Sequence, residues 1–183
     1  NTAAAWDIEP HTASWGVPAG LGVIVDPPNG MIPYQASALA KKRENFQNRE
    51  AADPLAKCFK PGVPRLTYLP FPLQIVQFSD RVVILYEYLH AIREIYTDGS
   101  PHPKGPVEFW MGDSRGHWEG DTLIVETAGF NGLAWLDGGR NPNSDALKVT
   151  QRMSFIDADH ILDEFTIDDA KYYTKPFKNI RTF

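Results

Sequence analysis

The sequence predicts a mainly β protein in which antiparallel strands form a barrel. Short runs of aliphatic, aromatic and polar residues recur between positions 73 and 167, and turn residues separate them. One segment alone has the composition of a good helix. The 15 prolines and 14 glycines indicate many turns. A hydrophobic fraction of 43% in 183 residues is enough for a single domain, 1–183, with a buried core.

The N-terminal part of the chain, residues 1–70, is expected to be an irregular arm and a helix that pack on the barrel. The helix is predicted over Ala36–Glu50, which is rich in Ala, Lys, Arg and Glu. Ser37 is its expected N-terminal cap. Leu39 and Phe46 share the helix face opposite the charged residues, and this face is therefore expected to be buried.

Strands are predicted wherever apolar runs lie between turn residues. Asp98-Gly99 and Glu119-Gly120-Asp121 are typical of tight turns between strands. The predicted strands are Leu73–Phe78, Arg81–Tyr88, Ala91–Thr97, Arg115–Trp118, Thr122–Thr127, Leu147–Ile156 and Ile161–Ile167, with Tyr172–Phe177 as one more at the end of the chain.

The number and order of these strands select the barrel type. About seven to nine strands, mostly joined to their sequence neighbours, favour a closed up-and-down barrel of the lipocalin-like kind. A β-sandwich is the main alternative. A cone-shaped NTF2-like α+β fold fits less well, because only one helix is evident in the sequence.

The run Arg81–Tyr88 is apolar on both faces. We therefore expect the barrel interior to cover one face and the arm or the helix to cover the other. Glu87 falls on the aliphatic face, where an unpaired carboxylate must find a partner or have a raised pKa. Pairing with the next strand about a turn at residues 89–90 would place Glu87 and Arg93 on one sheet face. The pattern thus predicts a buried Glu87–Arg93 pair.

Ionisable side chains along the predicted strands are candidates for acid–base chemistry. A carboxylate or imidazole in a dry barrel interior can have a pKa near neutrality, as proton abstraction requires. Arg93 could bind a substrate carboxylate or stabilise an enolate oxygen. The candidate catalytic residues are Glu87, His90, Arg93, Asp113, His117 and Glu126.

Aromatic side chains near the same strands are candidates for contacts with a substrate, because they offer stacking surfaces and hydrogen-bond donors. These candidates are Tyr86, Tyr88, Trp110 and Trp135. Trp135 lies in a long Gly- and Asn-rich loop, residues 130–146, and is expected to be exposed there. An apolar loop tip of this kind suits a pocket cover or a contact in a homodimer.

Familiar catalytic motifs are missing from the sequence. It contains no Walker loop, GxGxxG, HExxH, GxSxG or CxxC pair, which disfavours nucleotide chemistry and serine hydrolysis. The preferred hypothesis is an acid–base enzyme without a cofactor or metal, of the lyase, dehydratase, isomerase or cyclase type. Its substrate would be a small organic molecule in the barrel interior.

Two alternatives to this enzyme stay open. The first is a non-catalytic binder that holds a small hydrophobic or aromatic ligand in the barrel. The second is a metal-dependent enzyme with ligands from His90, His102, His117 and a carboxylate, although no local spacing of these residues indicates a metal site. A purely structural role also stays open, with the predicted Glu87–Arg93 pair as a buried ion pair that fixes strand register and His117 as a surface residue of its strand.

The charge and the chain start bear on partners and location. A net charge of −5 without a basic run argues against a nucleic-acid or anionic-membrane surface. No apolar run approaches the roughly 18 residues of a membrane-spanning helix. The sequence begins Asn1-Thr2-Ala3, without a methionine. This favours an exported protein, periplasmic or secreted, from which a signal peptide has been removed.

Several short motifs extend over most of the chain. They are Asp53-Pro54, Pro61-Gly62, Ile75-Val76-Gln77, Asp98-Gly99, Gly112-Asp113-Ser114 and Trp118-Glu119-Gly120-Asp121-Thr122-Leu123. Together they resemble a family of exported bacterial proteins that occur in soil and marine bacteria. The family signature has the pattern GDSxGxWEGDTLxVxTxGF, and its most specific piece is the Gly-x-Trp-Glu-Gly-Asp-Thr-Leu turn. The resemblance implies a lipocalin-like barrel and an exported location, and it identifies no catalytic residue.

Overall fold

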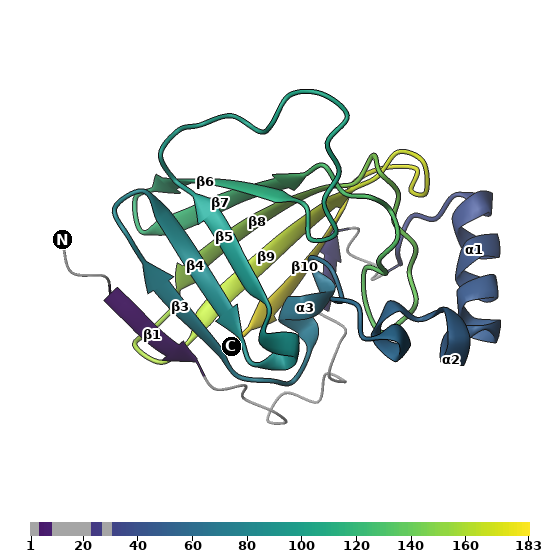
Figure 1. Ribbon diagram of the computed structural model, residues 1–183, viewed down its shortest axis with the longest axis horizontal. Helices are drawn as coiled ribbons and strands as arrows, with labels where there is room; N and C mark the ends of the chain where they lie inside the picture. The colour runs from purple at the N-terminus through teal and green to yellow at the C-terminus, as the bar shows by residue number, and fades with distance from the viewer. Residues whose placement is uncertain (1–3, 9–22, 27–30) are drawn as a thin grey trace.

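The strands of the protein curl into a half-barrel (Figure 1), and within the described residues its two edge strands are not paired with each other. The computed structural model describes residues 4–8, 23–26 and 31–183, so most of the predicted N-terminal arm lies outside the described residues. The strands are β1 (Ala4–Ile8), β2 (Val23–Asp26), β3 (Leu73–Gln77), β4 (Arg81–Tyr86), β5 (Ile92–Tyr96), β6 (Asp113–Glu119), β7 (Thr122–Ala128), β8 (Lys148–Phe155), β9 (Ile161–Asp168) and β10 (Phe177–Thr182).

These strands form one ten-stranded sheet with the order β1-β3-β4-β5-β6-β7-β8-β9-β10-β2, so β1 and β2 are its edges. The fold is mainly β and lipocalin-like with one substantial helix, which confirms the predicted class. One step departs from the antiparallel order, because β5 and β6 pair in parallel through Ile95↔Ser114 and Tyr96↔Arg115. A parallel pair needs a crossover, and residues 97–112 supply it.

The last strand begins later than the sequence suggested. β10 starts at Phe177, whereas Tyr173 makes only an isolated bridge to Tyr34. Pro176, which has no backbone N–H to give to a ladder, directly precedes the strand. β10 then pairs with β9 on one side and β2 on the other. A strand over Tyr172–Phe177 is therefore wrong.

The helices are α1 (Ala36–Gln47), α2 (Arg49–Ala52) and α3 (Arg65–Tyr68), with 3₁₀ turns η1 (Pro54–Lys57) and η2 (Tyr88–His90). The predicted helix therefore exists, but it breaks at Asn48 into α1 and α2. Ser37 is not its cap: α1 begins after Gln35, and the Ser37 hydroxyl donates to the carbonyl of Lys171 (3.5 Å). Within the described residues, none of the helices has the length and apolar character needed to cross a bilayer.

The buried face of α1 differs from the expected one. Ala38 and Asn45 are buried, whereas Leu39 and Phe46 are 40% and 56% exposed. The small Ala38 allows the helix to approach its neighbours closely, and Asn45 Nδ2 donates to the carbonyl of Arg140 (3.2 Å). The helix thus packs through a small, partly polar face.

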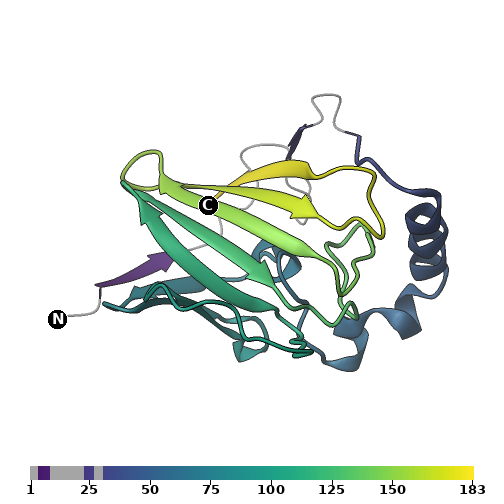
Figure 2. The same cartoon turned by 90° about the horizontal axis from the view of Figure 1, so that it is seen from above.

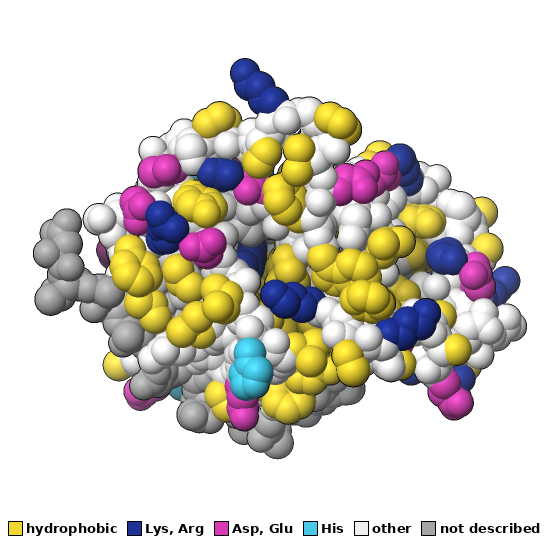
Figure 3. Space-filling model, in the orientation of Figure 1, with side chains coloured by type: hydrophobic (Ala, Val, Ile, Leu, Met, Phe, Trp, Pro, Cys, Tyr) yellow, Lys and Arg dark blue, Asp and Glu magenta, His cyan; other side chains and the backbone are white. Residues whose placement is uncertain are grey.

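Helix α1 does not cover the outer face of β4 and β5. Figures 1 and 2 both place α1 and α2 beyond one end of the barrel. On β4, Val83 and Leu85 point outward and are only half-buried, and the neighbouring Ile92 of β5 is exposed. Figure 3 shows hydrophobic side chains over this region beside a group of charged ones. The expectation that the helix covers this face is wrong.

Inward-pointing side chains form three layers along the barrel axis. The alternation Val149, Gln151, Met153 on β8 crosses all three of them. The first layer is apolar and includes Ile75, Val82, Ile84, Leu123, Met153 and Ile161. The middle layer is polar and includes Arg93, Ser114, Thr127, Gln151, Asp163 and Asn179. The third layer, at the end near α1, is apolar and includes Val149, Phe165, Ile167, Tyr173 and Phe177.

Candidate functional site

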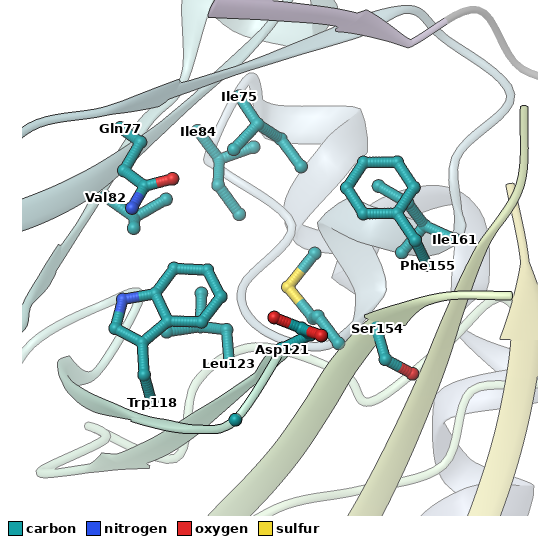
Figure 4. A pocket seen from close by; sticks show the side chains of 12 residues that line it. Ile75, Gln77, Val82, Ile84, Trp118, Asp121, Leu123, Ser154, Phe155 and Ile161 are labelled. Atoms are coloured by element: carbon teal, nitrogen blue, oxygen red, sulfur yellow. The ribbon is translucent and has the colours of Figure 1, made fainter. Parts of the chain in front are cut away.

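A hollow of about 560 Å³ occupies the first layer (Figure 4). The turns around it lie at the barrel end opposite α1, and Figure 1 shows the position of this helix. The β3–β4, β6–β7 and β8–β9 turns surround it. Inward-pointing strand residues and residues of these turns form its wall. They are Ile75, Gln77, Val82, Ile84, Trp118, Gly120, Asp121, Leu123, Met153, Ser154, Phe155 and Ile161.

The wall of this hollow is largely apolar. Trp118 of β6 and Phe155 of β8 lie on opposite sides of the space, with aliphatic side chains between them (Figure 4). Its polar side chains are Gln77, Asp121 and Ser154, which lie at or beside turns. An apolar wall with a few polar groups is typical of a small-molecule site.

The polar layer beneath the hollow is centred on Arg93, which is only 3% exposed. Its Nε donates to Ser114 Oγ (3.1 Å), Nη1 to Gln151 Oε1 (2.8 Å) and Nη2 to Thr127 Oγ1 (2.9 Å). The two hydroxyls of Ser114 and Thr127 are themselves 3.0 Å apart. A buried charge needs such partners, so these bonds hold the guanidinium in place.

Gln151 connects Arg93 to a second buried charge, Asp163. The amide oxygen of Gln151 accepts from Arg93, and its Nε2 donates to Asp163 Oδ2 (2.9 Å). Both Gln151 and Asp163 have no exposed surface. The guanidinium and the carboxylate are therefore joined through an amide rather than in direct contact.

This separation has an electrostatic consequence for Asp163. Burial raises the pKa of its carboxyl, while the hydrogen bond from Gln151 and the charges of Arg93 and Arg181 lower it; the result is a pKa of about 7. Burial raises the pKa because it disfavours the ionised form of the carboxyl, and here it outweighs the three effects that lower the pKa. The barrel interior thus contains a carboxyl that exchanges its proton near neutral pH.

The short helix α3 closes the barrel interior beside the polar layer. Thr67 Oγ1 lies 3.2 Å from the hydroxyl of Tyr86 on β4. Tyr68 shares hydrogen bonds with Asn179 on β10 and packs edge-on against Phe165 on β9. Burial raises the pKa of Tyr86 and of Tyr68, so both hydroxyls act as neutral hydrogen-bonding groups. α3 therefore connects opposite walls of the barrel.

Of the six predicted catalytic residues, Arg93 alone lies in the polar layer. Glu87, His90, His117 and Glu126 are exposed, and none of them lines the hollow. The predicted Glu87–Arg93 pair is wrong. β4 ends at Tyr86, and its register with β5 pairs Ile84 with Arg93, so the even-numbered residues of β4 share the Arg93 face.

Asp113, the sixth candidate, lies outside the barrel interior in a polar cluster of its own. Its Oδ2 is 2.6 Å from His102 Nδ1, and Arg115 donates to both carboxylate oxygens (2.8 and 2.9 Å). Burial alone would raise the pKa of Asp113, yet the bonds from Arg115 and His102 hold it below its ordinary value. Arg115 also donates to Ser100 (2.5 Å). The cluster thus fastens the β5–β6 connection to the start of β6.

The predicted aromatic contacts are dispersed over the protein. Tyr86 is in the barrel interior, whereas Tyr88 packs on Phe71 with ring centroids 4.8 Å apart. Trp110 stacks on Phe59, and its indole N–H donates to the carbonyl of Lys60. None of the three lines the hollow.

Trp135, the fourth aromatic candidate, is buried rather than exposed at a loop tip. It is 5% exposed and lies under the guanidinium of Arg65, at 5.5 Å from the ring centroid. Arg65 in turn makes two bonds to the carboxylate of Asp53 (2.7 and 2.8 Å). The loop 130–146 therefore packs into the protein, and its expected exposed apolar tip is wrong.

The described part of the chain contains no group of three or more His, Cys, Asp or Glu side chains arranged to hold a metal ion. His102 is bound to Asp113, and His117 lies 3.5 Å from Glu119 on the surface. The metal hypothesis thus gains no support from the positions of these histidines.

Comparisons with protein-family models, with curated proteins and with solved structures found no match. The resemblance to an exported bacterial family therefore stays a prediction.

The residues that sequence reasoning missed are Gln151 and Asp163 in the polar layer and Trp118 at the hollow. The first two occupy inward positions of the last hairpin, where the pattern Ile161, Asp163, Phe165 is otherwise apolar. A carboxylate on the apolar side of a regular alternation is a signal that could have identified Asp163.

Proposed function

We propose that this protein binds a small hydrophobic or aromatic molecule in the hollow. The apolar wall of the hollow supports this proposal, because burial of a ligand against it would remove apolar surface from water. The positions of Glu87, His90, His117 and Glu126 on the surface also favour binding over the acid–base mechanism built on those residues. The binder is thus the better supported of the two hypotheses.

Calorimetric titration with para-hexylanisole, a neutral apolar probe with an aromatic ring, tests this proposal. Leu123 and Met153 are paired across β7 and β8 and both line the hollow. Tryptophan at both positions should weaken binding at least about tenfold, because the added rings occupy the ligand space; tenfold corresponds to about 1.4 kcal/mol. Circular dichroism checks that the double variant is folded.

The matched control carries two tryptophans on the outer side of the same strands, Glu126→Trp on β7 and Lys148→Trp on β8. Both positions are exposed, so this variant should bind the probe as the unmodified protein does. Equal binding by the hollow-filling variant and the control would refute the site. Failure of the unmodified protein to bind would refute the proposal itself.

A second candidate function, the cofactor-free acid–base enzyme of the lyase or isomerase type, is favoured by one observation. Asp163 has a pKa of about 7, which suits a general base at neutral pH. In this mechanism Arg93 would act as a nearby positive charge rather than bind a substrate carboxylate, because its guanidinium nitrogens already donate to Ser114, Gln151 and Thr127. If the natural ligand is recovered from the protein, mass spectrometry and NMR should show that it is converted on incubation with the protein. No conversion by Asp163→Asn is expected, and equal conversion by both proteins would exclude this base.

A further inference from the structure

The two carboxylate oxygens of Asp163 differ in their surroundings. Oδ2 accepts a hydrogen bond from Gln151, whereas Oδ1 is buried and has no hydrogen-bond partner among the residues that the structure describes. A buried acceptor without a partner is costly, and native proteins contain few of them. A bound ligand could therefore donate the hydrogen bond that this oxygen lacks.

Asp163 lies directly next to the wall of the hollow. Its cross-strand partner on β8 is Met153, and Ile161 precedes it on the same face of β9. Both of these residues line the hollow. Paired residues of neighbouring strands have Cβ atoms about 5 Å apart on one face, so the Met153 side chain adjoins the carboxylate. Methionine is flexible and adapts readily to a neighbouring group.

The other groups of the polar layer already have partners. Arg93 donates to Ser114, Thr127 and Gln151, and Gln151 donates to Asp163. Among these groups, Asp163 Oδ1 is the acceptor to which none of the described residues donates a hydrogen bond. An acidic ligand would bring a second negative charge towards this oxygen, whereas a hydroxyl or amino group would supply the missing donor.

We propose that the ligand of the hollow is a mainly apolar molecule with one hydrogen-bond donor, a hydroxyl or amino group, which binds Asp163 Oδ1 after moving past Met153. This inference rests on the proposed binding function and adds the chemical class and the orientation of the ligand. The polar end of the molecule lies deepest, and its apolar body lies between Trp118 and Phe155.

Three probes with the same apolar body test the inference. Para-hexylphenol carries a donor, para-hexylanisole carries only an acceptor, and para-hexylbenzoate carries a negative charge. Titrations at about pH 8.5 keep Asp163, with its pKa of about 7, ionised and the phenol neutral. The unmodified protein should bind the phenol about tenfold more tightly than the anisole, as expected for a hydrogen bond to a charged acceptor.

Asp163→Asn is the informative variant. Its carbonyl oxygen can still accept from Gln151, and its amide N–H₂ then occupies the position of Oδ1. The preference for the phenol should fall to about twofold or less, because an N–H₂ group binds the anisole oxygen equally well. The matched control is Asp121→Asn, which changes a carboxylate in the wall near the surface and should keep the preference.

Equal binding of the phenol and the anisole by the unmodified protein would overturn the inference while leaving the binding function intact. A preference that persists in Asp163→Asn, or tightest binding of the benzoate, would likewise overturn it. Failure of all three probes to bind would overturn the binding function as well, so the two failures can be told apart.

Discussion

Replacement of Asp163 by asparagine should change how the stability of the protein depends on pH. The carboxyl of Asp163 is buried with a pKa of about 7, whereas an aspartate in an unfolded chain has a pKa near 4. Between about pH 4 and pH 7 the folded protein therefore holds a proton that the unfolded chain has released. The contribution of this group to stability is complete below about pH 4 and is lost as the pH rises through about 7.

The size of this effect follows from the difference in pKa. About three pH units, at about 1.4 kcal/mol per unit, correspond to roughly 4 kcal/mol. An asparagine does not titrate, so Asp163→Asn lacks this loss. Relative to the unmodified protein, the variant should gain up to roughly 4 kcal/mol between about pH 4 and pH 8.

Urea unfolding at a series of pH values measures this difference as a change in the free energy of unfolding. Asp113→Asn is a control with the opposite sign, because hydrogen bonds from Arg115 and His102 lower the pKa of Asp113. That variant should be less stable than the unmodified protein at neutral pH, and the gap should close as the pH falls below about 4. Parallel curves for Asp163→Asn and the unmodified protein from about pH 4 to pH 8 would refute a raised pKa at Asp163.

Three further substitutions test other parts of the structure. Arg93→Leu should lower the free energy of unfolding by about 3 kcal/mol, because it leaves buried partners such as Gln151 without their donor. A loss below about 1 kcal/mol in urea unfolding would contradict the role of Arg93 as the donor that stabilises the polar layer. Gly116→Ala should cost about 1–3 kcal/mol, since its Cβ would lie 2.8 Å from Ile95 Cγ2; an unchanged thermal midpoint would show that β6 can move away. Glu87→Gln should change the free energy of unfolding by less than about 0.5 kcal/mol and leave the affinity for para-hexylanisole unchanged. A clear loss of affinity in the calorimetric titration would show that Glu87 contributes to the binding site.

The fold could be predicted from the sequence because its strands are short, regular runs between strong turn residues. β3, β4, β5 and β7 lie within two residues of their predicted bounds. β10 was misplaced because Tyr172 and Tyr173 favour strands by composition while Pro176 delays the ladder. The parallel β5–β6 pair could not be foreseen, since no local pattern encodes a long crossover.

The candidate site was harder to predict, because a one-residue difference in register moves a side chain to the other face of a sheet. Arg93 was placed correctly in the interior. Glu87 was not, because the chain leaves the strand after Tyr86 and Glu87 has helical backbone angles. The hollow itself could not be predicted, since side chains from several strands determine its volume together.

The bridge through Gln151 explains two properties of the polar layer at once. A direct bond between Arg93 and Asp163 would hold the carboxyl ionised and occupy its oxygens. With Gln151 between them, the positive charge acts from a greater distance, so burial keeps the pKa of Asp163 near neutrality. The same arrangement leaves Oδ1 without a protein partner among the described residues. Burial raises the pKa of Asp163, and without a direct bond from Arg93 this effect is only partly offset, while Oδ1 keeps no donor among the described residues. A substitution that lets Arg93 reach Asp163 directly should therefore lower this pKa and supply a donor to Oδ1.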